Sequence, residues 1–191
     1  LIEAGINSAR SAIILTDTNL MPDNADAKSL MITLAVETIN PDVYTCVQLQ
    51  NSDNAIHLQR ANVDELVLFD VIGANLSVAS ALNPGITRMV SELVHFDDGS
   101  ELWKLSPPLP NDVVGTDFKD ASRWFLDKDI ILIGVESDEL KDSYLVTNDD
   151  SEEELTQKPG HRGVFVNPKK YEIQNDDALF VISDEAPETM L

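Results

Sequence analysis

The feature that most constrains the fold is an alternation of apolar runs and amphipathic segments between residues 11 and 69. Apolar runs at residues 11–16, 43–49 and 64–69 predict three strands. Between the first two, carboxylates at Asp23 and Asp26 are suited to the N-terminus of a helix that ends at Asn40. A shorter helix, capped by Ser52 or Asp53, is predicted before the third strand. This order indicates a parallel sheet covered by helices, as in half of a doubly wound α/β fold.

The other half of such a fold is not found in the sequence. No G-x-G-x-x-G motif occurs, so the usual phosphate-binding first half is missing and the sheet is expected to be incomplete. The chain begins at Leu1 without a methionine, and we expect it to be a fragment of a longer protein. No apolar run approaches the ~18 residues that a membrane-spanning helix needs.

Two helical stretches, 71–82 and 86–94, follow the third strand and are separated by the turn signal Asn83-Pro84-Gly85. They carry more apolar residues than a lone surface pair of helices should expose. We therefore predict that this helix–turn–helix crossover forms a homodimer. The predicted interface consists of Leu76, Ala79, Leu82, Ile86, Met89, Val90 and Leu93.

A second lobe is predicted beyond the polar run at residues 97–100. The expected domains are 1–96, with the incomplete sheet and the crossover helices, and 100–186, a smaller β-rich α+β lobe. Its strands are predicted at 101–105, 130–135, 163–166 and 178–183, with a helix at 116–125. The run at 130–133 is typical of a strand buried on both faces. The acidic run at 148–154 is expected to form a solvated loop outside the core.

Composition excludes some classes of partner. With 13 basic and 34 acidic residues the net charge is −21, which would repel nucleic acid and anionic lipid. The lone cysteine, Cys46, lies in an apolar strand pattern and is expected to be a buried, inert thiol. No spacing typical of a catalytic or zinc site is found, which favours a protein that is not an enzyme.

With these segments placed, the chain resembles the RCK family, the regulators of potassium conductance found in potassium channels and Trk-type uptake systems. The resemblance covers residues 5–95 and, more loosely, 100–185. Asn62 stands where the family usually has glycine, which predicts a turn residue at positive φ. The matching segments are AIILTD at 12–17, NADAK at 24–28, NPDVY at 40–44, NAIHLQRANVDELV at 54–67, VNP at 166–168 and DDALFVI at 176–182.

The resemblance implies candidate site residues at the end of the first strand. In calcium-gated members of the family, an acidic residue at the position of Asp17 coordinates a divalent cation. Two carboxylates on the next strand are its partners there, and their positions correspond to Gln48 and Gln50 in this chain. We take these three as candidate ligand-binding residues. The two amides are neutral whereas a hard dication prefers anionic oxygen, so a polar strand end is favoured over a calcium site. Asp17, Asp23 and Asp26 form an alternative metal set, although helix capping also explains the last two.

The predicted function is a non-catalytic, ligand-sensing regulatory domain on the cytoplasmic side of a membrane, controlling the pore of a potassium channel or transporter. A homodimer, and an octameric ring in the full assembly, are the expected oligomers. The cofactor is unknown. A divalent cation or a nucleotide is expected for the complete protein, and neither is expected to bind tightly to this fragment. A truncated Rossmann-type nucleotide-dependent enzyme is the alternative, and a free-standing cytoplasmic subunit of an uptake system is the third possibility.

Overall fold

The structure is a computed structural model of the 191-residue chain and describes residues 1–95, 99–138 and 162–187. The chain divides into two compact units, the first made of residues 1–82 and the second beginning at Asn83. This division falls in the turn between the two helices of the predicted crossover. The predicted domain boundaries, 1–96 and 100–186, follow the two lobes of the RCK family and stay a prediction. The predicted acidic loop at 148–154 lies outside the described residues.

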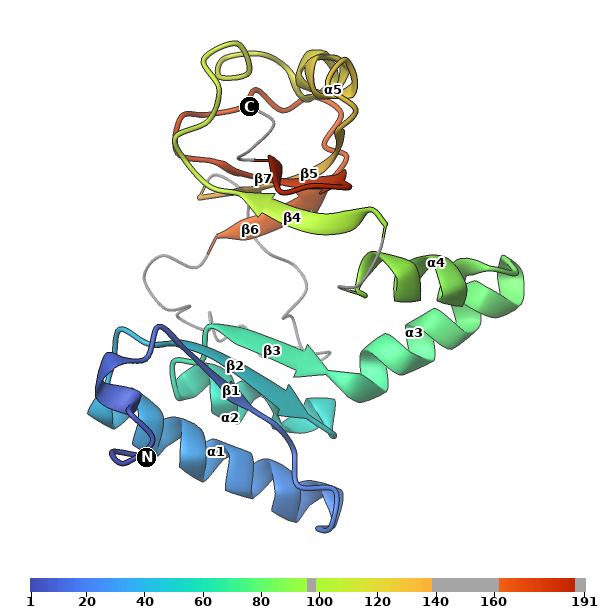
Figure 1. Ribbon diagram of the computed structural model, residues 1–191. Coiled ribbons are helices and arrows are strands. Elements are labelled where there is room, and N and C mark those ends of the chain that lie inside the picture. The colour runs from blue at the N-terminus through green and yellow to red at the C-terminus, as the bar shows by residue number, and fades with distance from the viewer. Residues whose placement is uncertain (96–98, 139–161, 188–191) are drawn as a thin grey trace. The chain divides into compact units, whose positions relative to one another are not determined.

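The first unit is a three-stranded parallel sheet with helices on one face (Figure 1). The strand order is β1-β2-β3, as the alternation of strands and helices predicts. Its elements are η1 (Ile6–Ser8), β1 (Ser11–Ile14), α1 (Pro22–Ile39), β2 (Tyr44–Leu49), η2 (Ser52–Asn54), α2 (Ala55–Arg60), β3 (Glu65–Leu68) and α3 (Phe69–Leu82).

Alternating burial along β2 gives the sheet one covered face and one open face. Thr45, Val47 and Leu49 are buried against the helices, whereas Tyr44 and Cys46 lie on the other face and remain partly exposed. The expectation of a buried Cys46 is therefore wrong, because the strand alternates instead of being covered on both sides. Desolvation, together with the nearby Glu65 charge, still raises the pKa of the Cys46 thiol.

Two predicted helix starts are also corrected. Helix α1 begins at Pro22 after an N-cap, Met21, that makes no side-chain cap hydrogen bond, so Asp26 does not cap its own helix. Neither Ser52 nor Asp53 caps α2: its N-cap is Asn54, which makes no side-chain cap hydrogen bond, and the Asn51 side chain caps the preceding η2 by accepting from the Asp53 N–H. The expected positive φ at Asn62 is confirmed, at 62°.

The second unit is a four-stranded antiparallel sheet with one helix packed on it. The strand order is β4-β7-β5-β6, so β5 and β7 are the inner strands. Its elements are α4 (Ile86–Leu93), β4 (Glu101–Leu105), α5 (Phe118–Leu126), β5 (Ile131–Ser137), β6 (Gly163–Val166) and β7 (Ala178–Ser183). Gly85, at φ 109°, is the N-cap of α4, a conformation that suits glycine.

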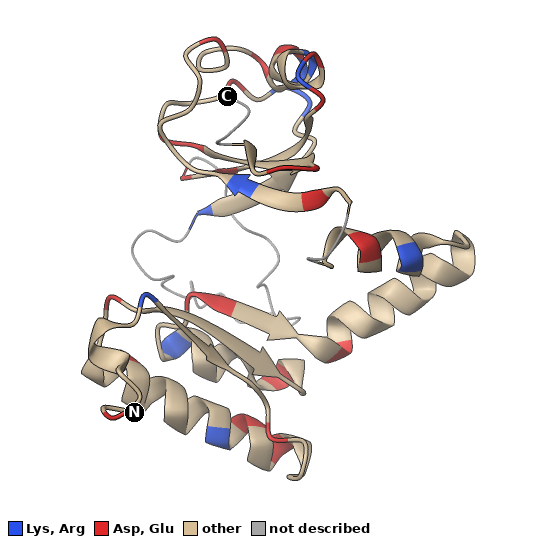
Figure 2. Ribbon diagram, viewed as in Figure 1, with Lys and Arg blue, Asp and Glu red and all other residues tan. Residues whose placement is uncertain are grey.

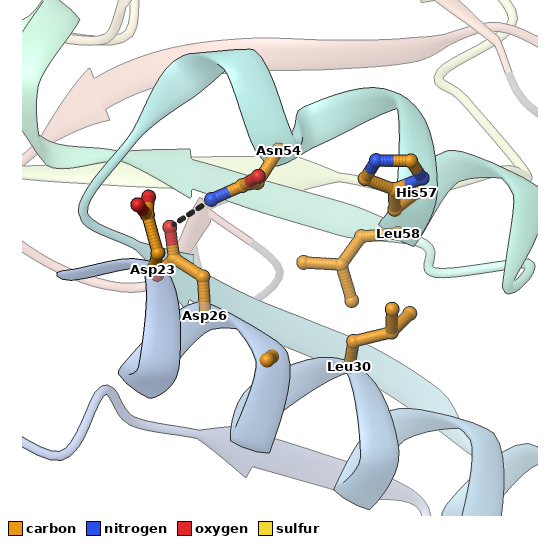
Figure 3. Close-up of a pocket in the computed structure, with 7 residues that line it drawn as sticks. Asp23, Asp26, Leu30, Asn54, His57 and Leu58 are labelled. Atoms are coloured by element: carbon orange, nitrogen blue, oxygen red, sulfur yellow. Dashed lines mark hydrogen bonds between the residues drawn. The ribbon is translucent and has the colours of Figure 1, made fainter. Parts of the chain in front are cut away.

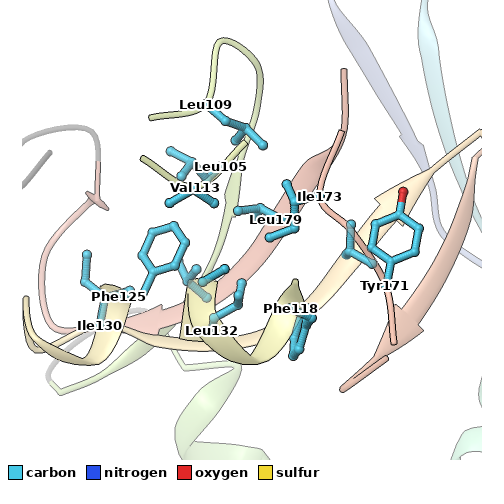
Figure 4. Packing of buried hydrophobic residues seen from close by; sticks show 13 residues of the cluster. Leu105, Leu109, Val113, Phe118, Phe125, Ile130, Leu132, Tyr171, Ile173 and Leu179 are labelled. Atoms are coloured by element: carbon cyan, nitrogen blue, oxygen red, sulfur yellow. The ribbon is translucent and has the colours of Figure 1, made fainter. Parts of the chain in front are cut away.

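The core of the second unit lies between α5 and one face of its sheet (Figure 4). Phe118 and Phe125 of α5 pack with Leu179 and Val181 of β7. The prediction that the run 130–133 is buried on both faces is wrong: Ile130 is fully buried, but Ile131 is 51% exposed on the opposite face of the sheet. An antiparallel sheet covered on one side only produces this alternation.

A buried polar cluster connects the strand ends of the same unit. The Asp177 carboxylate is fully buried, and it accepts the Tyr171 hydroxyl at 2.9 Å and the Gln174 N–H at 2.8 Å. The Tyr171 oxygen also lies 2.8 Å from the Ser137 Oγ at the end of β5. Because these polar groups satisfy one another, the cluster joins β5, β7 and the segment before β7 without leaving a buried charge unpartnered.

In the described part of the chain, no helix has the length and apolarity to cross a membrane.

Candidate functional site at the carboxyl edge of the parallel sheet

The carboxyl ends of β1, β2 and β3 meet at one edge of the first unit, because the strands are parallel. In open α/β sheets this edge is where ligands bind. Asp17 follows β1, Gln50 follows β2 and Asp70 lies just after β3, in the first turn of α3. Three polar side chains from three successive strand ends are thus brought to the same side of the sheet.

Asp17 is held by the start of helix α1. Its Oδ2 lies 2.7 Å from Lys28 Nζ, and its Oδ1 accepts the backbone N–H and the side-chain amide of Asn19, both at 3.1 Å. The hydrogen bond from Lys28, followed by those from Asn19, lowers the pKa of the Asp17 carboxyl to about 2. Asp17 is therefore ionised over the physiological pH range, and a cation placed there would compete with Lys28.

The two candidate glutamines are placed differently. Gln50 lies beyond the end of β2, and its Nε2 donates to the Thr16 Oγ1 at 3.2 Å, so it reaches the residue next to Asp17. Gln48 lies within β2, half-buried on the open face of the sheet. The structure thus brings Gln50 to the Asp17 turn. A joint role of Asp17, Gln48 and Gln50 in ligand binding stays a prediction.

Asp26 organises the loop that follows β2. Its side chain comes from the second turn of α1 and is 2% exposed. It accepts the N–H groups of Gln50 and Asn51, each at 3.0 Å, and the side-chain amide of Asn54 at 2.9 Å. A buried carboxylate with three donors of this kind is well compensated. Asp26, which the sequence indicated as a helix cap, therefore stabilises the loop after β2 from its position on helix α1.

A small cavity of about 100 Å³ lies between α1 and α2 beside this carboxylate (Figure 3). Asp23, Asp26 and Asn54 form its polar end, while Leu30 and Leu58 form its apolar side. Asp23 accepts the Asn51 amide at 3.2 Å and so holds the same loop from the surface. The cavity is large enough for a few water molecules and too small for a nucleotide.

Each of the three carboxylates of the predicted metal set already has partners within the protein. Asp17 is bound by Lys28 and Asn19, Asp23 by Asn51, and Asp26 by the loop amides. Among residues 1–95, 99–138 and 162–187, no three His, Cys, Asp or Glu side chains form a group that could hold a metal ion. Cation binding by Asp17, Asp23 and Asp26 stays a prediction.

Helix α3 carries apolar residues that remain exposed among the described residues of its own unit. None of its residues is classed as buried, and Val78 and Leu82 are 61% and 75% exposed. Leu76 and Ala79 are half-buried. In α4 the predicted interface residue Met89 is exposed, whereas the partly buried ones are Ile86, Val90 and Leu93. The dimer interface stays a prediction, but the exposed apolar surface it requires is present.

Sequence reasoning missed Asp70 and Ser52 as site residues. Asp70 Oδ2 accepts the Ser52 N–H at 3.1 Å, so the start of α3 is tied to the loop after β2. Desolvation is the largest single effect on the Asp70 carboxyl and raises its pKa. The hydrogen bonds from Ser52 and Val71 together outweigh it, so the pKa of Asp70 is lowered. The only available signal was the position of an aspartate directly after a predicted strand.

Fold and site define an α/β protein with an incomplete Rossmann-like sheet, a polar carboxyl edge and a separate β-rich lobe. Residues 1–69 match the TrkA-N domain family. The match covers 69 of the 191 residues, and the predicted resemblance to the RCK family is confirmed. The comparison with curated proteins finds no match.

One solved structure has a similar fold. The human SLO3 gating ring is 15% identical, with a TM-score of 0.69, and the match covers 98% of this chain and 35% of that chain. The GsuK RCK domain (17% identity, TM-score 0.35) and the GsuK channel bound to NAD (18% identity, TM-score 0.37) also match, each over 99% of this chain, and over 33% and 28% of those chains. The chain spans about a third of the length of these structures.

Proposed function

We propose that this chain is a non-catalytic regulatory module of a potassium channel or potassium uptake system, located on the cytoplasmic side of the membrane. The fold is similar to that of the human SLO3 gating ring, and residues 1–69 match the TrkA-N domain family. The module acts by associating with a second copy of itself, and in a complete assembly by forming a ring. A ligand at the carboxyl edge of the sheet would bias two arrangements of the associated copies.

The exposed apolar surface of α3 is the observation that supports this proposal. Asp70 is the only charged residue of the helix, and the rest of its ribbon is uncharged along its length (Figure 2). A surface helix in a chain with net charge −21 would be expected to carry charges on its free side. A helix without them is suited to burial against another apolar surface. A second copy supplies such a surface by symmetry.

The first test measures the oligomeric state of the chain by analytical ultracentrifugation. Leu82→Glu and Val78→Glu each place a carboxylate on the exposed apolar side of α3. Each should weaken association at least tenfold, since burying one large apolar side chain contributes about 1.5–3 kcal/mol. Ser77→Glu is the matched control, because it adds the same charge about 100–140° away from Val78 and Leu82 around the helix.

Regulation itself is tested in the full-length protein. Potassium flux into vesicles that contain the complete protein is measured for wild type, Leu82→Glu and Ser77→Glu. The proposal requires Leu82→Glu to alter the flux and Ser77→Glu to leave it near wild type. A stable monomer at tens of micromolar, or a regulated flux that Leu82→Glu does not change, would contradict it.

A further inference from the structure

The loop from Gln50 to Asn54 is hydrogen-bonded on both sides by carboxylates from different helices. On one side, Asp26 of α1 accepts the N–H groups of Gln50 and Asn51. On the other side, Asp70 of α3 accepts the next N–H, that of Ser52. Three successive backbone donors are thus divided between two helices. The loop cannot shift as a unit without changing its distance to at least one of them.

The two ends of this arrangement have different surroundings. At one end, Gln50 reaches Thr16, the neighbour of Asp17, at the edge where the fold places ligands. At the other end, Asp70 also accepts the Val71 N–H at 2.8 Å and so is joined to the first turn of its own helix. That helix carries the exposed apolar surface proposed to meet a second copy of the chain.

We infer that the loop Gln50–Asn54 couples the carboxyl edge of the sheet to helix α3 through Asp26 on one side and the Ser52–Asp70 hydrogen bond on the other. The local contacts stand independently, and their regulatory meaning rests on the proposed function. In this arrangement Asp26 and Asp70 are positioning residues. Occupation of the edge next to Thr16 displaces Gln50, the loop follows, and the N-terminal turn of α3 is pulled or released.

A mutant cycle read by hydrogen exchange tests the coupling in the chain as it exists. Asn54→Ala removes one donor to Asp26 and loosens the loop from the α1 side. Asp70→Ala removes the acceptor on the α3 side, whereas Asp70→Asn keeps an oxygen acceptor there. Exchange rates of the amides in the first two turns of α3 are compared among wild type, each single variant and the double variant, with matched oligomeric state.

Coupling predicts that Asn54→Ala accelerates exchange at the start of α3 at least several-fold. The upper limit is about a hundredfold, the factor that corresponds to one strong hydrogen bond to a charged group. The same change in the Asp70→Ala background should add nothing, and Asp70→Asn should restore the effect. Asp53→Ala is the control, since that exposed side chain lies in the same loop. Asp26→Asn provides a second perturbation from the α1 side.

Two results would overturn the inference: no change in α3 exchange when the loop is loosened, or an equal acceleration with and without Asp70. Neither result touches the proposed function, which is decided by association and potassium flux. Conversely, coupling observed in a chain that remains monomeric would leave this inference standing and remove the proposed role of α3 as a dimer interface.

Discussion

Replacing Asp26 with alanine should be among the most destabilising substitutions in the first unit. The change leaves two backbone N–H groups and one side-chain amide without their acceptor, in a place where the carboxylate is 2% exposed. A buried donor that loses its partner costs about 1–3 kcal/mol, so three would sum to about 3–9 kcal/mol. The adjacent cavity of about 100 Å³ can admit water to some of these donors. We therefore expect the lower part of that range, about 3–4 kcal/mol.

Urea denaturation followed by circular dichroism measures this loss, with the m-value checked for constancy. Asp23→Ala is the matched control, since it removes a carboxylate in the same helix that holds one exposed amide. Its cost should stay near 0.5 kcal/mol, the range of surface substitutions. If Asp26→Ala costs no more than Asp23→Ala, then water replaces the carboxylate freely and the loop is not held in the way described.

Three further substitutions test other parts of the structure. Tyr171→Phe deprives buried Asp177 of a donor and should cost about 1–3 kcal/mol in denaturation, whereas Tyr44→Phe, on the open face, should cost under about 0.5; equal losses would contradict the buried cluster. Lys28→Gln should raise the pKa of Asp17 from about 2 toward 3.8, as measured by a carbon-detected NMR titration. The stability that Lys28 contributes in the wild type is therefore present above pH 3.8 and is lost as the pH falls toward 2. An Asp17 titration that is unchanged in Lys28→Gln would refute the role of Lys28. Gly134→Ala places a Cβ 2.8 Å from the Phe165 carbonyl oxygen and should cost about 1–3 kcal/mol, and unaltered stability would show that β6 yields freely.

The fold could be predicted because local patterns decide it. Apolar runs and helical spacing located each strand of both sheets to within two residues at either end, and the order of strands and helices implied the parallel sheet. Exposure of individual strand faces could not be predicted in this way. Ile131 and Cys46 lie in runs typical of buried strands, yet each sits on the uncovered face of its sheet. Coverage depends on where helices pack, which a run of residues does not encode.

The candidate site was predictable in its location but not in its contacts. Asp17 and Gln50 follow predicted strands, and parallel topology brings strand ends to one edge. The partner of Asp26 is 24 to 28 residues away in sequence, and that of Asp70 is 18 residues away. Both aspartates occupy positions where helix capping or dipole effects are the expected explanation from sequence. Only the packing of α1 and α3 beside the β2 loop reveals that they bind backbone amides there.

The carboxyl edge combines two kinds of electrostatic contact that respond differently to salt. Asp17 and Lys28 form an exposed ion pair at 2.7 Å, and such pairs are weakened as ionic strength rises. Asp26 is buried, and within the described residues it is bound by neutral donors of the loop, so counterions reach it poorly. A rise in salt should therefore free Asp17 and Lys28 from each other while the loop after β2 keeps its geometry. The loop is thus already ordered before any cation competes with Lys28 for Asp17, so no free energy is spent on ordering a disordered loop at that point.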